Sequence, residues 1–84
     1  GFEMARPKKS KAIADAAAYR KARGLSQTAF WAPYGVSQSM ASRFEAFRRP
    51  SAAVEMLLVL VETGVLTEAD LLKARKIADA SRPS

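Results

Sequence analysis

Apolar residues recur along most of this chain with the spacing of amphipathic helices. The pattern divides the sequence into five helical segments with short connections rich in Gly, Ser and Pro, and it contains no convincing pair of strands. Such short connections favour helices that pack against their neighbours, so the pattern indicates an all-α bundle of compact helix-turn-helix type. The predicted helices cover residues 11–23, 26–35, 38–47, 52–62 and 67–80.

Residues that start and stop helices support these boundaries. Gly24 stands where a left-handed C-terminal cap is expected, and Ser26 is a favourable N-cap for the next helix. Pro33 lies inside that helix, where it removes a hydrogen bond and clashes with the preceding turn. We therefore expect the helix to bend there and to end by Gly35, with Ser37 capping the third helix.

The segment 52–62 is the most apolar part of the chain, and its three valines make a strand the alternative interpretation. Its length, the possible cap at Ser51 and the helical surroundings favour a buried central helix. The last helix is expected to begin after Thr67, with acidic residues in its first turn that suit the positive end of the helix dipole.

The 84 residues allow one small domain. We assign residues 11–80 to this domain, with the helix-turn-helix at 26–47 and with residues 51–80 supplying core and a dimerisation surface. Residues 1–10 are interpreted as a cloning remnant, ahead of Met4, followed by a flexible basic arm.

Positive charge is concentrated in the first part of the chain. Residues 1–49 contain ten Lys/Arg and three Asp/Glu, a net charge of +7, whereas residues 50–84 contain four basic and five acidic residues, a net charge of −1. A basic face of this kind suits a polyanion, either nucleic acid or an anionic lipid surface. A solvated face that keeps the protein in solution has the same composition and is the alternative.

The sequence contains neither cysteine nor histidine. Zinc sites and the common nucleophile–base pairs depend on these residues, and the eight acidic residues show no clustering typical of paired catalytic carboxylates. We therefore expect a protein that is not an enzyme and needs no cofactor or metal. The lack of cysteine and of an apolar run near the ~18–20 residues that span a bilayer fits a cytoplasmic protein.

Two short capped helices joined by a turn at Gly35 form a helix-turn-helix, in which the first helix crosses the phosphate backbone and the second faces base edges. This segment resembles the Cro/CI-type (lambda-repressor-like, XRE-family) transcriptional regulators, especially short bacterial repressors of phage and plasmid origin. The resemblance rests on Leu25-Ser26-Gln27, Gly35-Val36-Ser37-Gln38-Ser39, Ser42-Arg43-Phe44-Glu45 and Arg48-Arg49-Pro50. It implies a five-helix lambda-repressor-like DNA-binding domain.

The resemblance also implies roles for single residues. It places Gln38, Ser39 and Arg43 at base-reading positions, where a side-chain amide pairs with adenine and a guanidinium with guanine. It places Arg20 and Glu45 in an ion pair that joins the first and third helices. Together with the basic arm and the connector after the third helix, it predicts contacts to the DNA backbone from Gln27, Ser37, Ser42, Arg48, Arg49, Lys8 and Lys9.

Three residues depart from the family pattern. Trp31 stands where the family usually has a small alanine, and Phe47 stands where it usually has a glycine that caps the recognition helix. Pro33 interrupts the helix between them. All three bear on the angle at which the recognition helix is held.

A single reading helix contacts only about 4–5 base pairs, so useful specificity favours a homodimer on an inverted repeat. The expected function is a transcriptional regulator in the bacterial nucleoid, most simply a repressor that blocks a palindromic operator. The alternative is a helix-turn-helix interaction module such as an antitoxin. Candidate interface residues are Val65, Leu66, Leu71, Leu72 and Ile77.

Overall fold

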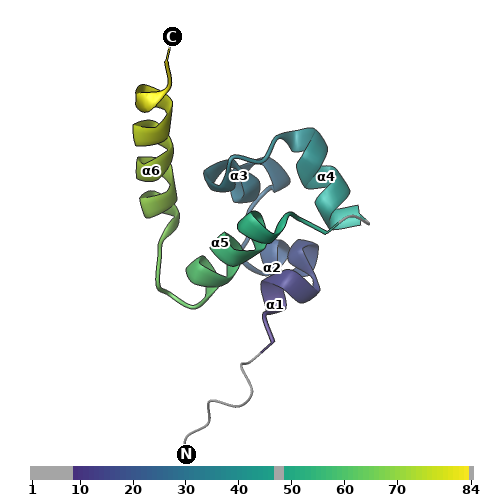
Figure 1. Ribbon diagram of the computed structural model, residues 1–84. Coiled ribbons are helices and arrows are strands. Elements are labelled where there is room, and N and C mark those ends of the chain that lie inside the picture. The colour runs from purple at the N-terminus through teal and green to yellow at the C-terminus, as the bar shows by residue number, and fades with distance from the viewer. Residues whose placement is uncertain (1–8, 47–48, 84) are drawn as a thin grey trace, which may run out of the picture.

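The computed structural model describes residues 9–46 and 49–83, and in these ranges it is all-helical. Figure 1 shows helices α1 to α5 gathered into one body, with α6 standing along one side of it. The all-α prediction is confirmed. The elements are α1 (Lys11–Ala14), α2 (Ala16–Ala22), α3 (Gln27–Trp31), the 3₁₀ turn η1 (Ala32–Tyr34), α4 (Gln38–Ala46), α5 (Ala52–Glu62) and α6 (Glu68–Ser81).

The single helix predicted over residues 11–23 is wrong, because the chain breaks at Asp15 into α1 and α2. Asp15 has φ −155° and ψ 86°, and its side chain accepts a hydrogen bond of 3.0 Å from the Ala18 N–H. A short acidic side chain that bonds a nearby backbone N–H caps a new helix rather than continuing the old one. The alanines on either side favour a continuous helix, so the sequence pattern alone did not indicate that the capping bond of Asp15 would interrupt it.

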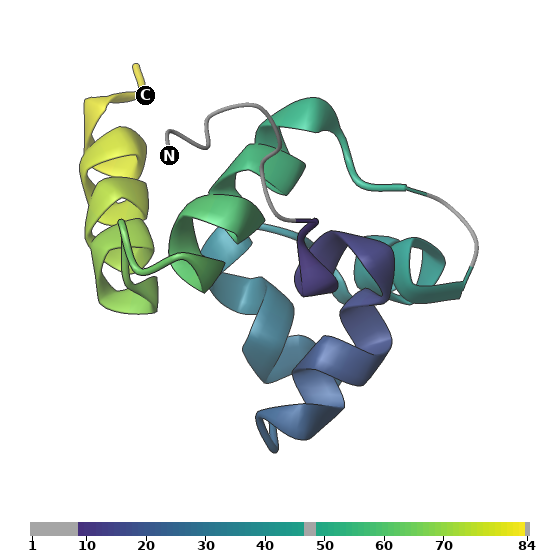
Figure 2. The same ribbon diagram turned by 90° about the horizontal axis from the view of Figure 1, so that it is seen from below.

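The short helix α1 is anchored to α5 at its N-terminus. Ser10 caps α1 by accepting a hydrogen bond from the Ile13 N–H, and its hydroxyl donates to the carboxylate of Glu62. The same carboxylate accepts the Lys11 N–H at 3.1 Å, and Ala12 is fully buried. Figure 2 shows α1 lying beside α5 on this side of the molecule. These contacts let four residues of helix persist where an isolated turn would not.

The predicted bend at Pro33 is confirmed. The helix ends as α3 at Trp31, and Pro33 lies in the first positions of η1, where its missing N–H costs nothing. Gly35 then ends η1 with φ 72°, a left-handed conformation that Gly adopts without the Cβ penalty. Ser37 begins α4 by accepting a hydrogen bond from the Met40 N–H.

The buried core joins the N-terminal helices to α5 and the start of α6. Aromatic rings from α3 and η1 form its centre, and edge-on pairs such as Phe30 with Trp31, 5.1 Å between centroids, stabilise it. The fully or nearly buried apolar residues are Ala12, Phe30, Trp31, Tyr34, Ala41, Leu58 and Leu71.

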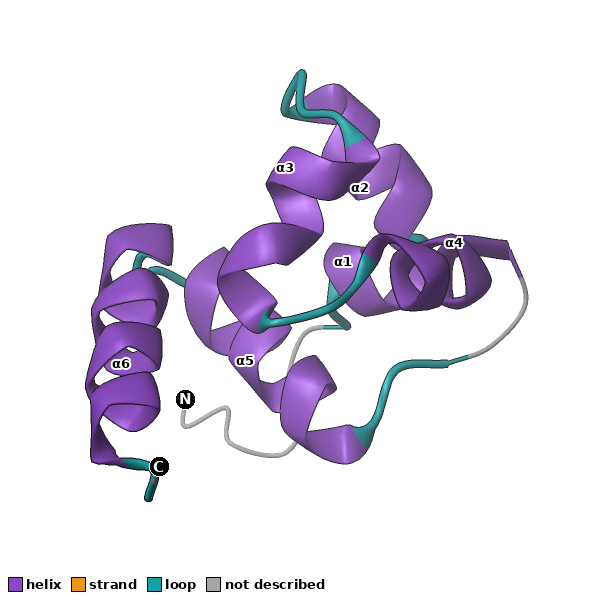
Figure 3. Ribbon diagram, turned by 90° about the horizontal axis from the view of Figure 1, so that it is seen from above, coloured by secondary structure: helices purple, strands orange, loops and turns teal. Residues whose placement is uncertain are grey.

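Helix α6 contacts the body mainly through its first two turns. Leu71 is 7 % exposed and belongs to the core, whereas Leu72 and Ile77 are 49 % and 60 % exposed. Arg75 lies over the turn at Gly35, where an added Cβ would stand 2.9 Å from Nη1 of the guanidinium. Figure 3 shows the rest of α6 running along the edge of the body. The capping box of Thr67 and Asp70 fixes where this helix begins.

Among the residues that the structure describes, no helix is both long and apolar enough to cross a membrane. In the same ranges, no cluster of three or more acidic side chains is arranged to hold a metal ion.

Candidate functional site

The exposed polar face of α4 carries the residues predicted to read bases. Gln38, Ser39, Ser42 and Arg43 are all exposed, while Ala41 on the opposite side is fully buried. Positions 38 and 42, and positions 39 and 43, are four residues apart, and positions 39 and 42 are three apart, which places the four residues on one side of a helix. The structure therefore brings the predicted residues together over the first turns of α4, where they have access to a ligand.

The N-terminal end of α4 is open and well defined. The hydroxyl of Ser37 caps it, and the Ser37 carbonyl accepts the Ala41 N–H at 2.8 Å. Ser37 itself is exposed. Unpaired N–H groups and the positive end of the helix dipole at such a terminus favour an anion. Gln38 is the first residue of the helix, so its amide lies beside this end.

The C-terminal end of α4 is fixed to α2 and α3 through Glu45. Arg20 donates to it twice, from Nε to Oε2 at 2.8 Å and from Nη2 to Oε1 at 3.0 Å. Gln27 donates its amide N–H to Oε1 at 3.2 Å, and the Trp31 indole N–H donates to Oε2 at 2.7 Å. We call Arg20, Gln27, Trp31 and Glu45 the carboxylate cluster. Its four hydrogen bonds use about all the acceptor sites that a carboxylate offers.

The carboxylate cluster is shielded from water and keeps Glu45 ionised. The side chains of Arg20 and Glu45 are 12 % and 7 % exposed. Burial acts to raise the pKa of the Glu45 carboxyl, but the hydrogen bonds from Arg20, Trp31 and Gln27 and the charge of Arg20 outweigh it, so the pKa lies below its usual value. The hydrogen bond to Glu45 raises the pKa of Arg20. The structure thus shows the Arg20–Glu45 pair that the family resemblance implied.

Sequence reasoning missed the role of Trp31. The indole ring is fully buried, and burial of an indole N–H requires an acceptor. Glu45 supplies that acceptor from α4, so the large residue at a usually small position is accommodated by a specific bond. The sequence did contain a signal for this bond. Trp31 lies on the inner side of the helix that also carries Gln27, and the helix packed against it contains one acidic residue, Glu45.

Gln27 is half-buried, and its side-chain amide can donate two hydrogen bonds. One hydrogen of its amide nitrogen is used by Glu45, and an amide nitrogen carries two. The second hydrogen remains for another acceptor. The neighbouring carboxylate also fixes which end of the amide is nitrogen, because only that end can donate to Glu45.

The predicted backbone-contacting cations fall into two groups. Lys9 and Arg49 are exposed, and Arg49 forms an ion pair of 3.2 Å with Glu55 while its own side chain stays 81 % exposed. An exposed pair of this kind is weak, so the guanidinium can exchange partners. Lys8 and Arg48, as well as Phe47, lie outside the described residues.

The predicted interface residues do not share one environment. Leu71 belongs to the buried core, and Leu66 packs partly against it. Val65 is 66 % exposed, and Leu72 and Ile77 on α6 are also exposed.

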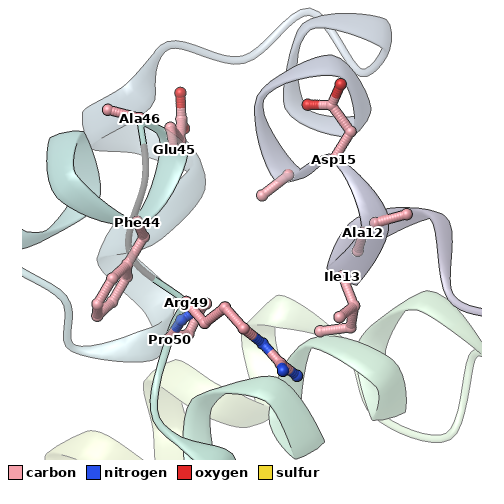
Figure 4. A pocket seen from close by; sticks show the side chains of 10 residues that line it. Ala12, Ile13, Asp15, Phe44, Glu45, Ala46, Arg49 and Pro50 are labelled. Carbon is pink, nitrogen blue, oxygen red and sulfur yellow. The ribbon is translucent and has the colours of Figure 1, made fainter.

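A small hollow of about 190 Å³ opens between α1 and the C-terminal end of α4. Figure 4 shows Ile13 and Asp15 on one side of it and Phe44 and Glu45 on the other. The hollow lies at the far end of α4 from Gln38, so it is separate from the exposed polar face.

The family model described as the RsaL-like HTH domain matches residues 17–61, which is more than half of the chain. The match runs from α2 through α5 and contains the whole carboxylate cluster and the exposed face of α4. Comparison with curated proteins and with solved structures gives no significant match.

Proposed function

The chain belongs to the RsaL-like helix-turn-helix domain family, and on this premise we propose that it represses transcription as a homodimer bound to an inverted-repeat operator. Membership in the family supports DNA binding and a role in transcription regulation. The closer resemblance to Cro/CI-type regulators of phage and plasmid origin stays a prediction, as does a place in the nucleoid.

The observation that carries the proposal is the contrast between the two sides of α4. One side presents Gln38, Ser39, Ser42 and Arg43 to solvent and the other side packs on the core, while the carboxylate cluster fixes the C-terminal end of the helix. A polar helix face held on a rigid support is what base reading in a major groove requires.

We assign base reading to Gln38, Ser39 and Arg43. The amide of Gln38 suits N6 and N7 of adenine, and Arg43 suits O6 and N7 of guanine. Contacts to phosphates are assigned to Ser37, Ser42 and the free amide hydrogen of Gln27. Lys8, Lys9, Arg48 and Arg49 add sequence-independent attraction.

The test begins with selection of bound sites from a random duplex pool, which reports specificity, palindromy and half-site spacing together. Gln38→Ala is then measured against the selected site and a scrambled duplex. We expect a loss of about 1–3 kcal/mol for the selected site alone, because the lost contact is to a base. Arg82→Ala, a substitution at the exposed residue that directly follows α6, is the control and should leave the preference unchanged. Equal loss on both duplexes would refute base reading by Gln38.

The proposed dimer uses exposed apolar residues at the C-terminal end of the domain. Because Leu66 and Leu71 serve the protomer, Val65, Leu72 and Ile77 remain as the candidates for the seam. Leu72 and Ile77 are five residues apart and so point about 140° away from each other around α6. They therefore face different neighbours. Sedimentation analysis of Leu72→Glu and of Ile77→Glu separates them: the substitution that yields monomer marks the seam.

An apolar groove of about 470 Å³ between α1 and α5 favours a second candidate, an interaction module of antitoxin type. Ile13, Met56, Val59 and Leu60 line the groove, and Met56 is 62 % exposed. A stoichiometric partner that co-purifies with the chain and is lost in Met56→Glu would favour this candidate.

A further inference from the structure

Trp31 holds the recognition helix α4 by two contacts at once. Its buried ring packs edge-on against Phe44, with centroids 5.6 Å apart, and its indole N–H donates to Glu45 at 2.7 Å. Phe44 and Glu45 are adjacent residues of α4, so their side chains leave the helix in different directions. One contact limits how close α4 comes to α3, and the other limits how far α4 can rotate about its own axis.

The rotation of α4 decides where the base-reading residues point. Gln38 and Glu45 are seven residues apart, which is close to two helical turns, so they lie on nearly the same side of α4. A rotation that moves Glu45 therefore moves Gln38 in the same direction. Recognition sites lose function when their groups leave the productive geometry by more than about 0.5 Å or 10–20°.

The donors to Glu45 constrain it in different ways. Arg20 binds both carboxylate oxygens as a fork and is itself held by a bond of 2.9 Å to the Leu25 carbonyl, whereas Gln27 makes the longest bond of the cluster at 3.2 Å. The indole is a rigid donor with two rotatable bonds, and aromatic neighbours Phe30, Tyr34 and Phe44 surround it. Its N–H therefore has one direction in the folded domain.

We propose that Trp31 is a positioning residue for DNA recognition, whose indole N–H fixes α4 through Glu45 and so directs Gln38, Ser39 and Arg43 at the bases. The inference rests on the proposed function. It separates two roles of one side chain: the ring fills the core, and the N–H sets specificity.

The experiment removes the N–H and keeps the ring. Trp31 is the only tryptophan of the chain, so biosynthetic replacement by benzothienylalanine exchanges the N–H for sulfur at this position alone. Trp31→Phe is the genetically encoded counterpart. Phe30→Leu is the matched control, because Phe30 is also buried in the aromatic core but has no side-chain donor for Glu45. Affinities for the selected operator and for a scrambled duplex are measured at several salt concentrations, at a temperature where each variant is folded.

We expect both Trp31 replacements to lower the ratio of operator to scrambled affinity by roughly tenfold, equivalent to about 1.4 kcal/mol. The affinity for scrambled DNA and its salt dependence should stay unchanged, since the cations are untouched. Phe30→Leu should lower thermal stability and keep the ratio. A benzothienylalanine protein that keeps the full ratio would overturn the positioning role.

A second measurement needs no substitution at Trp31. The single indole N–H resonance of the unmodified protein should exchange slowly with water and should shift in Glu45→Gln. Rapid exchange in the folded protein would contradict the hydrogen bond and the inference with it. If the unmodified protein shows no preference for any duplex, the proposed function itself fails, and this outcome is distinct from a preference that survives loss of the N–H.

Discussion

Substitution of Glu45 by alanine should destabilise the domain more than any other single change to a charged residue in the described ranges. The change leaves Arg20 as a charge with 12 % of its side chain exposed and removes the acceptor of the fully buried indole of Trp31. Breaking a buried pair from one side costs about 3–5 kcal/mol, because the remaining charge is uncompensated. A domain of this size has a free energy of unfolding of about 5–10 kcal/mol, so the loss is a large fraction of it.

Thermal and urea unfolding followed by circular dichroism measures this loss. The melting temperature of Glu45→Ala should fall by roughly 15–30 °C. Glu55→Ala is the matched control: Glu55 also pairs with an arginine, but the Arg49 side chain is 81 % exposed, so its removal should cost about 0–1 kcal/mol. If the two alanine variants unfold at the same temperature, the carboxylate cluster does not hold the helices together as we argue.

The pH dependence of the same comparison gives an independent check. The pKa of Glu45 is lowered in the folded protein, so the carboxylate stabilises the fold fully above the ordinary glutamate pKa. This contribution is lost as the pH falls through the lower pKa of the folded state. The free-energy difference between the unmodified protein and Glu45→Ala should therefore be constant near neutral pH and shrink in acid. A difference that grows on acidification would contradict the assigned direction.

Three further predictions follow from local geometry. Gly35→Ala and Gly24→Ala should each destabilise the domain by about 1–2 kcal/mol in urea unfolding, because both glycines have positive φ; the Cβ added at Gly35 meets only the movable end of the Arg75 side chain, so Arg75→Ala in the Gly35→Ala background should restore little of the loss. Burial and the charge of Glu68 raise the pKa of Tyr34 to about 12, so Tyr34→Phe should remove a phenol that ionises near that pH in an ultraviolet titration. Asp15→Ala should cost about 1 kcal/mol through loss of the α2 cap, and an unchanged melting temperature would refute the assigned break between α1 and α2.

The helix-turn-helix could be predicted from the sequence because its boundaries depend on local chemistry. Ser26, Pro33 and Gly35 each act on the backbone within a few residues, and the structure places a cap, a tightened turn and a left-handed glycine at these positions. The exposure of Gln38 and Arg43 also follows from helical spacing once the helix is placed.

The remaining features depend on contacts between distant segments. The break at Asp15 competes with a strongly helical run of alanines, and the anchoring of α1 by Glu62 spans about fifty residues of sequence. The bond from Trp31 to Glu45 depends on how two helices face each other. Leu71 and Leu72 are adjacent and chemically identical, so only the packing of α6 on η1 decides which one is buried.

The carboxylate cluster also limits how this sequence can change through evolution. Donors from two successive helices, α2 and α3, meet one carboxylate on α4, so a change at any one member leaves the others with unmatched donors or charge. Single substitutions at these positions are therefore destabilising rather than neutral. A relative that lacks the acid at position 45 should also lack the tryptophan and the arginine. The exposed face of α4 is not constrained in this way, because its side chains are not part of the carboxylate cluster. New operators can thus be acquired by substitutions at Gln38, Ser39 and Arg43 while the support behind them stays the same.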